Sequence, residues 1–195
     1  MYFSIIKNYD IANGPGCRVS LFVSGCSNKC KGCFQPETWD PKYGHLFTKN
    51  VQDGIFDMVN NDNINGLTIL GGDPFFYKHR GYGDNITPIK KLVLNFREKF
   101  NNTKDIWVYT GYTIEYLLNY PSNYGKNIDI LDILNNIDFL VDGPFDQKLK
   151  DPSLQFRGSA NQRIIDMNKT RKSRFTKLYT KNRLEDKKYI IIPLK

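Results

Sequence analysis

The sequence predicts an α/β fold in which mostly parallel strands form a partial, open (β/α) barrel. Short apolar runs rich in β-branched and aromatic residues alternate with longer stretches of helical periodicity, an order typical of parallel βα units. Each of these runs is followed within two residues by a glycine. Four such runs are too few for a closed eight-stranded barrel, so we expect an open arrangement.

The four apolar runs are the predicted strands. They span residues 18–24, 66–70, 106–110 and 139–141. In parallel βα architectures the chemistry gathers beyond the carboxyl ends of the strands, so the loops that follow these runs are expected to share one rim. Those loops are residues 25–26, 71–74, 110–112 and 142–145.

Residues 86–100 give the clearest helix prediction. Their apolar residues recur at helical spacing, with lysine, arginine and glutamate off that face. Three other helices are predicted at residues 51–60, 113–120 and 128–137.

The length of 195 residues fits one domain with an appendage. We expect a domain over residues 1–168 and a basic C-terminal extension over residues 169–195, in which residues 189–192 are a candidate strand of the core. The N-terminus does not read as a basic leader, and no segment approaches the roughly 18 apolar residues of a membrane span. The sequence therefore predicts a soluble, cytoplasmic protein without membrane association.

The net charge of +8 is concentrated near the C-terminus. Residues 144–195 hold 14 Lys and Arg against 5 Asp and Glu, most densely at residues 169–174. Clustered cations attract the phosphates of nucleic acids, but this segment has no recognisable nucleic-acid-binding motif. A solvated surface or a contact to an acidic protein is the favoured interpretation, and we expect the extension to dock on a protein partner.

Three cysteines, Cys26, Cys30 and Cys33, stand in one short loop directly after the first predicted strand. Their Cys-x3-Cys-x2-Cys spacing allows three thiolates to converge on one soft metal centre. Three ligands leave one coordination position open, which is typical of a reactive metal site rather than a structural one. The three cysteines are therefore candidate metal ligands and catalytic residues.

Other interpretations of these cysteines have less support. Structural zinc usually needs four nitrogen or sulfur ligands, and the spare candidates Cys17, His45 and His79 form no second pair. A disulfide framework does not suit a chain long enough to bury its own core and without a secretory leader. Unliganded core thiols do not suit a loop as polar as residues 27–31. The spacing favours a redox or catalytic cluster, with zinc second.

Gly71 and Gly72 follow the second predicted strand and precede Asp73 and Pro74. Without a Cβ atom, two glycines let a ligand approach the backbone closely and make positive φ accessible. An isolated Gly-Gly-Asp-Pro is most often a tight turn. Beside the cysteine loop it becomes a candidate site for the amino and carboxylate ends of an amino-acid-like ligand.

Together these motifs resemble the activating proteins of anaerobic (class III) ribonucleoside-triphosphate reductase and, more loosely, the activase of pyruvate formate-lyase. Both are radical S-adenosylmethionine (SAM) enzymes that activate glycyl-radical enzymes. The resemblance is tight over residues 13–40, which include Gly14-Pro15-Gly16-Cys17-Arg18 and the cysteine loop, and over residues 67–75. It continues in residues 110–112, 141–145 and 156–163, and ends at about residue 168.

The resemblance implies an open barrel of the radical SAM type in which Cys26, Cys30 and Cys33 hold a [4Fe–4S] cluster and SAM occupies the fourth iron. It also implies reductive cleavage of SAM and abstraction of a hydrogen from a glycine of the large reductase subunit, which leaves a glycyl radical there. An electron donor such as reduced flavodoxin is part of this scheme. The implied cofactor-binding residues are Gly32, Cys33, Phe34, Gly71, Gly72, Asp73 and Pro74.

Two positions depart from the wider radical SAM pattern. Gly32 stands where many of these enzymes have an aromatic residue, and Asp73 stands where many have glutamate. Three alternative functions remain open. They are an activase of another glycyl-radical enzyme of the pyruvate formate-lyase type, a radical SAM enzyme acting on a small molecule, and a noncatalytic metal-bound nucleic-acid module.

Overall fold

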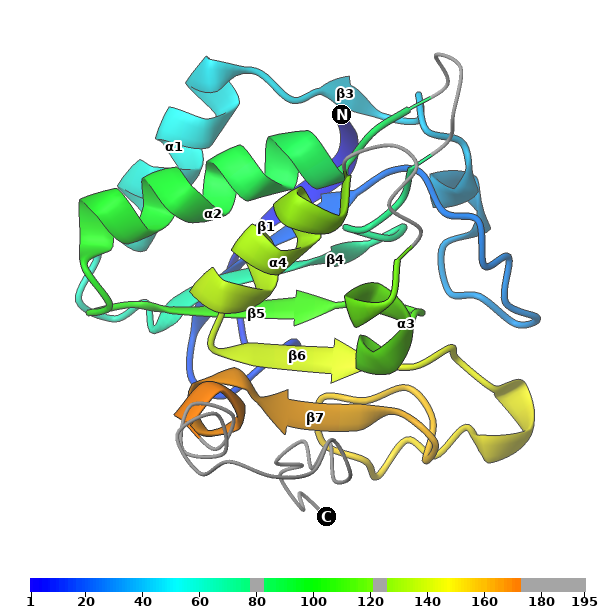
Figure 1. Cartoon of the computed structure of the whole chain (residues 1–195). Coiled ribbons are helices and arrows are strands. Elements are labelled where there is room, and N and C mark those ends of the chain that lie inside the picture. The colour runs from blue at the N-terminus through cyan, green and yellow to red at the C-terminus, as the bar shows by residue number, and fades with distance from the viewer. Residues whose placement is uncertain (78–82, 121–125, 173–195) are drawn as a thin grey trace.

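The computed structural model describes residues 1–77, 83–120 and 126–172 (Figure 1). Within these residues the strands form one seven-stranded sheet in the order β3-β1-β2-β4-β5-β6-β7. The strands are β1 (Tyr2–Asp10), β2 (Arg18–Val23), β3 (His45–Leu46), β4 (Gly66–Gly71), β5 (Asp105–Tyr109), β6 (Phe139–Asp142) and β7 (Arg163–Asp166). The neighbours β2, β4, β5 and β6 run parallel, whereas β1, β3 and β7 pair antiparallel at the two sides of this parallel centre.

The predicted open α/β arrangement is confirmed, because β3 and β7 lie at opposite ends of the sheet order and the sheet does not close. The four predicted strands correspond to β2, β4, β5 and β6. The three antiparallel strands were not predicted. β3 has only two residues, and most of β1 is partly or fully exposed, so neither carries the continuous apolar signal of a buried parallel strand.

The helices are α1 (Lys49–Val59), α2 (Ile86–Phe100), α3 (Ile114–Leu118) and α4 (Lys126–Asn136), with short 3-10 helices η1 (Pro36–Trp39) and η3 (Gln147–Leu149). The prediction for α2 is confirmed at both ends. α1 begins two residues before its predicted start, because the Thr48 side chain accepts a hydrogen bond from the Val51 N–H and caps the helix there. α3 is shorter than predicted and begins directly after its own cap, Thr113.

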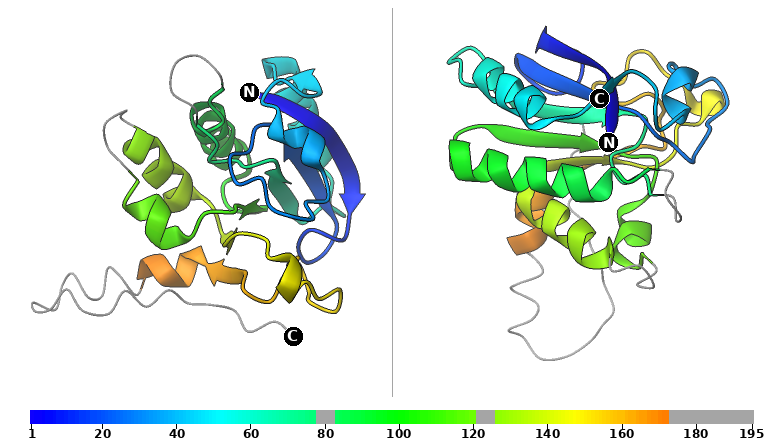
Figure 2. Two further views of the ribbon diagram at one scale, coloured as in Figure 1. Left: turned by 90° about the vertical axis from the view of Figure 1, so that its right-hand side faces the viewer. Right: turned by 90° about the horizontal axis from the view of Figure 1, so that it is seen from above.

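The two faces of the sheet pack differently. Residues such as Leu21, Ile69 and Val108 point to the face covered by α1, α2 and α4, and with the apolar sides of those helices they form the main core. Figures 1 and 2 show α2 and α4 together on this side of the sheet. The alternate residues of the same strands point to the opposite face, where Trp107, Val141 and Ile164 form a second, smaller apolar cluster.

Arg18, the first residue of β2, is fully buried on this second face. Its guanidinium forms an ion pair with Asp105, and its Nε donates a 2.7 Å hydrogen bond to the Thr68 hydroxyl. Gly14 has φ +131°, and a Cβ atom there would lie 2.9 Å from Cδ of Arg18. The Gly14–Arg18 motif therefore anchors the beginning of β2 across β4 and β5.

The predicted domain boundary at residue 168 falls inside a short helical segment, residues 167–172, which follows β7. Arg171 donates hydrogen bonds to the carbonyl oxygens of Leu134 and Ile137, at 2.9 and 3.0 Å. The first residues of the proposed extension therefore pack on the end of α4. The remainder, including the candidate strand at residues 189–192, lies outside the described residues. In the described ranges, no helix has the length and apolar character needed to cross a membrane.

Candidate functional site

A cavity of about 550 Å³ opens at the carboxyl ends of the parallel strands, on the sheet face opposite α1, α2 and α4. Its floor includes Phe22, Leu70 and Tyr109, which are the outward-facing residues near the ends of β2, β4 and β5. The cavity is of the size that proteins use for small-molecule ligands, and it lies where parallel α/β folds place their active sites.

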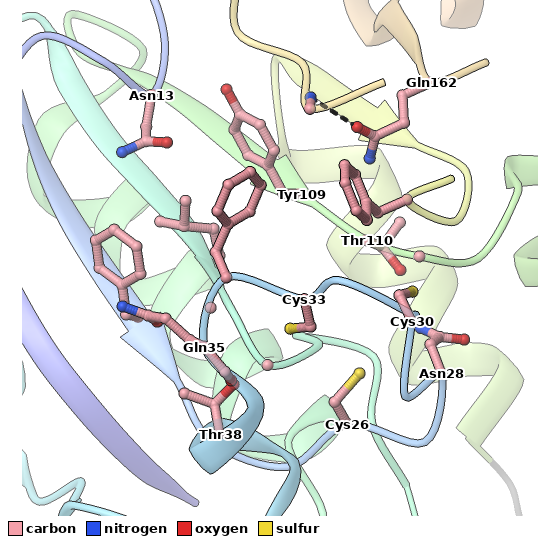
Figure 3. A pocket seen from close by; sticks show the side chains of 18 of the residues that line it. Asn13, Cys26, Asn28, Cys30, Cys33, Gln35, Thr38, Tyr109, Thr110 and Gln162 are labelled. Atoms are coloured by element: carbon pink, nitrogen blue, oxygen red, sulfur yellow. Dashed lines mark hydrogen bonds between the residues drawn. The ribbon is translucent and has the colours of Figure 1, made fainter. Parts of the chain in front are cut away.

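All three cysteines of the loop after β2 line this cavity, and Figure 3 shows their side chains around it. They are half-buried free thiols. The loop leaves the sheet at Gly25, whose φ is +97° and where a Cβ atom would lie 2.6 Å from the ring of Phe76. The Gly25 N–H then donates to the Thr38 carbonyl at 2.7 Å, which fixes the loop against η1.

Burial changes the acidity of two of these thiols. Burial and the nearby charge of Asp73 raise the pKa of Cys26 to about 11. Burial likewise raises the pKa of Cys30. Thiolates are the metal-binding form, so metal binding at this loop must displace protons from the cysteines.

The three thiols border one shared cavity. In an iron–sulfur cluster each thiolate binds a different iron, so its cysteine ligands stand around a common space. A zinc ion instead needs all its sulfur ligands at about 2.3 Å from one point. The shared cavity is an arrangement that suits the cysteine ligands of a cluster.

Gly71 and Gly72 also line the cavity, at the end of β4. A Cβ atom on Gly71 would lie 2.7 Å from backbone atoms of Val23, and one on Gly72 would lie 2.6 Å from the carbonyl oxygen of Gly25. The Gly72 N–H donates to the Val23 carbonyl at 2.7 Å. The two glycines were predicted to leave space for a ligand. A second reason for them is that the ends of β4 and β2 pack backbone against backbone.

Asp73 is fully buried and does not line the cavity. Its carboxylate accepts hydrogen bonds from the Asn28 side chain at 2.9 Å, the Thr110 hydroxyl at 3.0 Å, the Gly111 N–H at 3.0 Å and the Phe75 N–H at 2.9 Å. Burial raises the pKa of Asp73 to about 6, and these hydrogen bonds oppose the rise. The side chain thus joins the loops that follow β2, β4 and β5.

The residues predicted to bind SAM therefore fall into two groups. Cys33, Phe34, Gly71 and Gly72 line the cavity, whereas Gly32, Asp73 and Pro74 do not. Gly32 faces away, and a Cβ atom there would lie 2.9 Å from the side chain of Gln147.

Several cavity residues were not singled out from the sequence. Gln162 is one: its side chain accepts hydrogen bonds from the N–H groups of Gly158 and Ser159, at 2.8 and 3.2 Å, and donates to the Gly143 carbonyl at 3.1 Å. It thereby closes the segment of residues 156–163 against the loop after β6. Asn28 and Tyr109 were also missed, whereas Thr110 belongs to the predicted functional loop 110–112. Their positions next to cysteines or strand-ending glycines are the only sequence signal for them.

Comparison with known protein families supports the iron–sulfur interpretation. Residues 12–165 match the family described as "4Fe-4S single cluster domain". This range contains the cysteine loop, the Gly-Gly loop and the segment closed by Gln162.

Similar proteins from different organisms carry the same name. The chain is 42% identical over 155 residues to the anaerobic ribonucleoside-triphosphate reductase-activating protein of Escherichia coli (strain K12), covering 78% of this chain and 90% of that protein. It is 38% identical over 164 residues to the protein of the same name from Enterobacteria phage T4, covering 84% of this chain and 93% of that protein. The protein of the same name from Vibrio cholerae serotype O1 is 39% identical over 157 residues, covering 80% of this chain and 91% of that protein. These matches extend over nearly the whole length of each relative.

Proposed function

Because this chain belongs to the family of anaerobic ribonucleoside-triphosphate reductase-activating proteins, we propose that it generates the glycyl radical on the large subunit of that reductase. The observation that carries the proposal is the position of Cys26, Cys30 and Cys33 on the same cavity as Gly71 and Gly72. We assign the three cysteines as ligands of a [4Fe–4S] cluster whose fourth iron is left for SAM. The fold is then an open barrel of the radical SAM type.

The cofactors supply the difficult chemistry. A cluster held by Cys26, Cys30 and Cys33 would supply the one electron that cleaves SAM reductively to methionine, and the adenosyl part of SAM would take up the hydrogen atom of the glycine Cα, giving 5′-deoxyadenosine and a glycyl radical.

The residues of the chain bind, orient and exclude water. The polar end of SAM is assigned to the cavity wall formed by Gly71 and Gly72, next to the cysteines. The apolar floor of Phe22, Leu70 and Tyr109 limits access of water. Asp73 acts as a positioning residue, because its buried carboxylate holds the loops around the cavity without reaching into it.

The open sheet suits a substrate that is a loop of another protein, since such a loop must enter from the side. A reduced flavodoxin is the proposed type of electron donor. The four cysteines are free thiols, which suits the reducing cytoplasm. Residues 169–195 lie beyond the region matched to the family, and we assign them to docking on the large subunit.

Anaerobic reconstitution tests this proposal directly. The protein loaded with iron and sulfide, then given dithionite and SAM, should release methionine and 5′-deoxyadenosine in equal amounts. Cys33→Ala should abolish both products. Cys17→Ala is the matched control, because Cys17 is a half-buried thiol that does not line the cavity, and it should keep its iron and its activity. Cluster-loaded protein that leaves SAM intact, or a Cys17→Ala variant that loses its iron while Cys33→Ala keeps it, would contradict the assignment.

A further inference from the structure

The cavity described above has two ends. At one end it is bordered by the three cysteines and the Gly-Gly pair, at the carboxyl ends of β2 and β4. The other end lies further back along the sheet, between Lys7 and Asn13 on one side and residues 154–158 on the other. Lys7 is exposed and its ammonium group lies 5.1 Å from the centre of the Phe22 ring, so this end opens to solvent beside β1. We call it the β1 end of the cavity.

The side chain of Tyr109 carries a buried hydroxyl group into this cavity. Tyr109 is the last residue of β5 and lines the cavity. Its hydroxyl oxygen is buried, and the described residues offer it no hydrogen-bond partner. A buried hydroxyl without a partner has lost its hydrogen bonds to water, at a cost in free energy that a phenylalanine in the same place would avoid. A partner that arrives with a ligand explains why the hydroxyl is there.

The hydroxyl points away from the cysteines. Figure 3 shows it directed to the side of Asn13, whereas the three cysteine sulfurs lie on the other side of the ring. The charged groups that face it are Asp10, the last residue of β1, and Arg18, the first residue of β2. A strand rises about 3.3 Å per residue, so Arg18 lies about 16 Å from the end of β2 where the cysteine loop begins. The Tyr109 hydroxyl therefore faces the β1 end of the cavity.

The hydroxyl is a hydrogen-bond donor in an apolar setting. Burial raises the pKa of Tyr109 above its ordinary value of 10; Arg18 opposes the rise and Asp10 adds to it. The group therefore keeps its proton at neutral pH. Phe22 and Phe156 line the same cavity. A hydrogen bond made beside such apolar side chains is strengthened by the low local dielectric.

The proposed reaction needs both SAM and the target glycine in this cavity. SAM is assigned to the cysteine end, so the glycine of the large subunit has the β1 end, which opens to solvent. A glycine has no side chain, and the groups by which a protein can hold it are the backbone N–H and C=O groups at and beside it. A single buried O–H donor matches a peptide carbonyl oxygen.

We propose that Tyr109 is a substrate-binding residue, whose hydroxyl donates a hydrogen bond to a backbone carbonyl oxygen beside the target glycine and so orients the glycine Cα–H toward SAM. This inference rests on the proposed function and adds one residue and one contact to it. The hydrogen bond itself moves no proton and breaks no bond. It fixes the direction in which the glycine presents its hydrogen atom, and reactions of this kind lose rate steeply when the reacting atoms are misplaced.

The test removes the hydroxyl oxygen and keeps the ring, in Tyr109→Phe. Tyr43→Phe is the matched control, because Tyr43 is 43% exposed and does not line the cavity. Both variants and the unmodified protein are loaded with iron and sulfide, reduced with dithionite and given SAM and the large subunit. The measured quantities are the 5′-deoxyadenosine released per glycyl radical formed, the dissociation constant of SAM and the midpoint of urea unfolding.

We expect about one 5′-deoxyadenosine per glycyl radical in the unmodified protein and in Tyr43→Phe. In Tyr109→Phe the ratio should rise about fivefold, the factor that corresponds to a net hydrogen bond of about 1 kcal/mol. The dissociation constant of SAM should stay within about twofold. The urea midpoint of Tyr109→Phe, measured without SAM or large subunit, should equal or exceed that of the unmodified protein, since the substitution removes an unpaired buried hydroxyl.

An unchanged ratio in Tyr109→Phe would overturn the proposal. So would a SAM affinity weakened as much as the ratio was expected to rise, because the hydroxyl would then bind the adenosyl part of SAM. A urea midpoint below that of Tyr43→Phe would also overturn it, because the hydroxyl would then have a partner within the chain. Failure of the proposed function looks different, since the unmodified protein would then leave SAM intact after reduction.

Discussion

The side-chain amide of Asn28 donates a 2.9 Å hydrogen bond to the carboxylate of Asp73. Asn28 lies between Cys26 and Cys30, and Asp73 directly follows the Gly-Gly pair. This one contact therefore connects the loop that carries the proposed cluster ligands with the loop proposed to bind SAM. Because Asp73 is fully buried, the hydrogen bond is shielded from competing water.

Replacing Asn28 with alanine should loosen the cysteine loop without removing a ligand. A hydrogen bond to a charged group contributes about 1.5–3 kcal/mol, so Asn28→Ala should lower the free energy of unfolding by up to that amount and speed the loss of iron to a chelator several-fold. Ser27→Ala, at an exposed neighbouring position, is the control and should behave as the unmodified protein. Equal iron retention in Asn28→Ala and Ser27→Ala would show that the contact does not hold the loop.

Gly72→Ala should destabilise the fold rather than act on SAM alone. The added Cβ would lie 2.6 Å from the Gly25 carbonyl oxygen, a backbone atom that cannot rotate away. Overpacking of this kind costs about 1–3 kcal/mol, measurable by urea unfolding of the metal-free protein. Gly54→Ala on α1 is the control, because its Cβ would meet no atom within 4 Å, and it should raise stability by up to about 1 kcal/mol. A Gly72→Ala protein of normal stability with weakened SAM affinity would mean that Gly72 is needed only to leave space for the ligand.

The contrast between these two loops shows what the sequence could reveal. The cysteine spacing and the Gly-Gly pair are local patterns, so both were found without a structure. The Asn28–Asp73 contact joins residues 45 positions apart, and neither residue type by itself signals a buried hydrogen bond. Asp73 was therefore predicted to contact SAM, although its carboxylate is occupied by protein donors.

In the fold, too, the features with a local sequence pattern were predicted and those that depend on long-range contacts were not. The four parallel strands were predicted because burial on both faces gives them continuous apolar runs. The strand β7, only four residues long, was not predicted, because its antiparallel pairing with β6 exists only once the chain is folded. The cavity floor was also unpredictable, since Phe22, Leu70 and Tyr109 meet only when three parallel strands are in register.

Arg18→Met should be strongly destabilising. Removing one partner of a buried ion pair costs about 3–5 kcal/mol, and we expect the lower end of this range because the Asp105 side chain is 31% exposed. Arg18 also donates hydrogen bonds to the Thr68 hydroxyl and to the carbonyl oxygen of Leu67. The measurement is the free energy of unfolding in urea. Lys49→Met removes the exposed pair with Asp53 and should change stability by no more than about 0.5 kcal/mol. Similar effects of the two substitutions would mean that Arg18 does not anchor β2.

The ion pair between Arg163 and Glu115 should make stability depend on pH. Arg163 donates to both carboxylate oxygens of Glu115, at 3.0 and 2.8 Å, and these hydrogen bonds hold the pKa of Glu115 below its ordinary value of 4.5. A lowered folded-state pKa means that the contribution is complete above the ordinary value and is lost as the pH falls below it. The difference in melting temperature between the unmodified protein and Glu115→Gln should therefore shrink from pH 7 to pH 4. A difference that stays constant over this range would contradict the assignment.

The central claim is that a radical made from SAM in this cavity removes a hydrogen from a glycine of the large reductase subunit. The most direct test uses a large subunit whose glycines carry deuterium at Cα, incubated anaerobically with the reduced, cluster-loaded protein and SAM. The mass of the released 5′-deoxyadenosine is then measured beside the electron paramagnetic resonance signal of the subunit. The account predicts one deuterium in 5′-deoxyadenosine for each glycyl radical formed. A glycyl radical accompanied by unlabelled 5′-deoxyadenosine would contradict it.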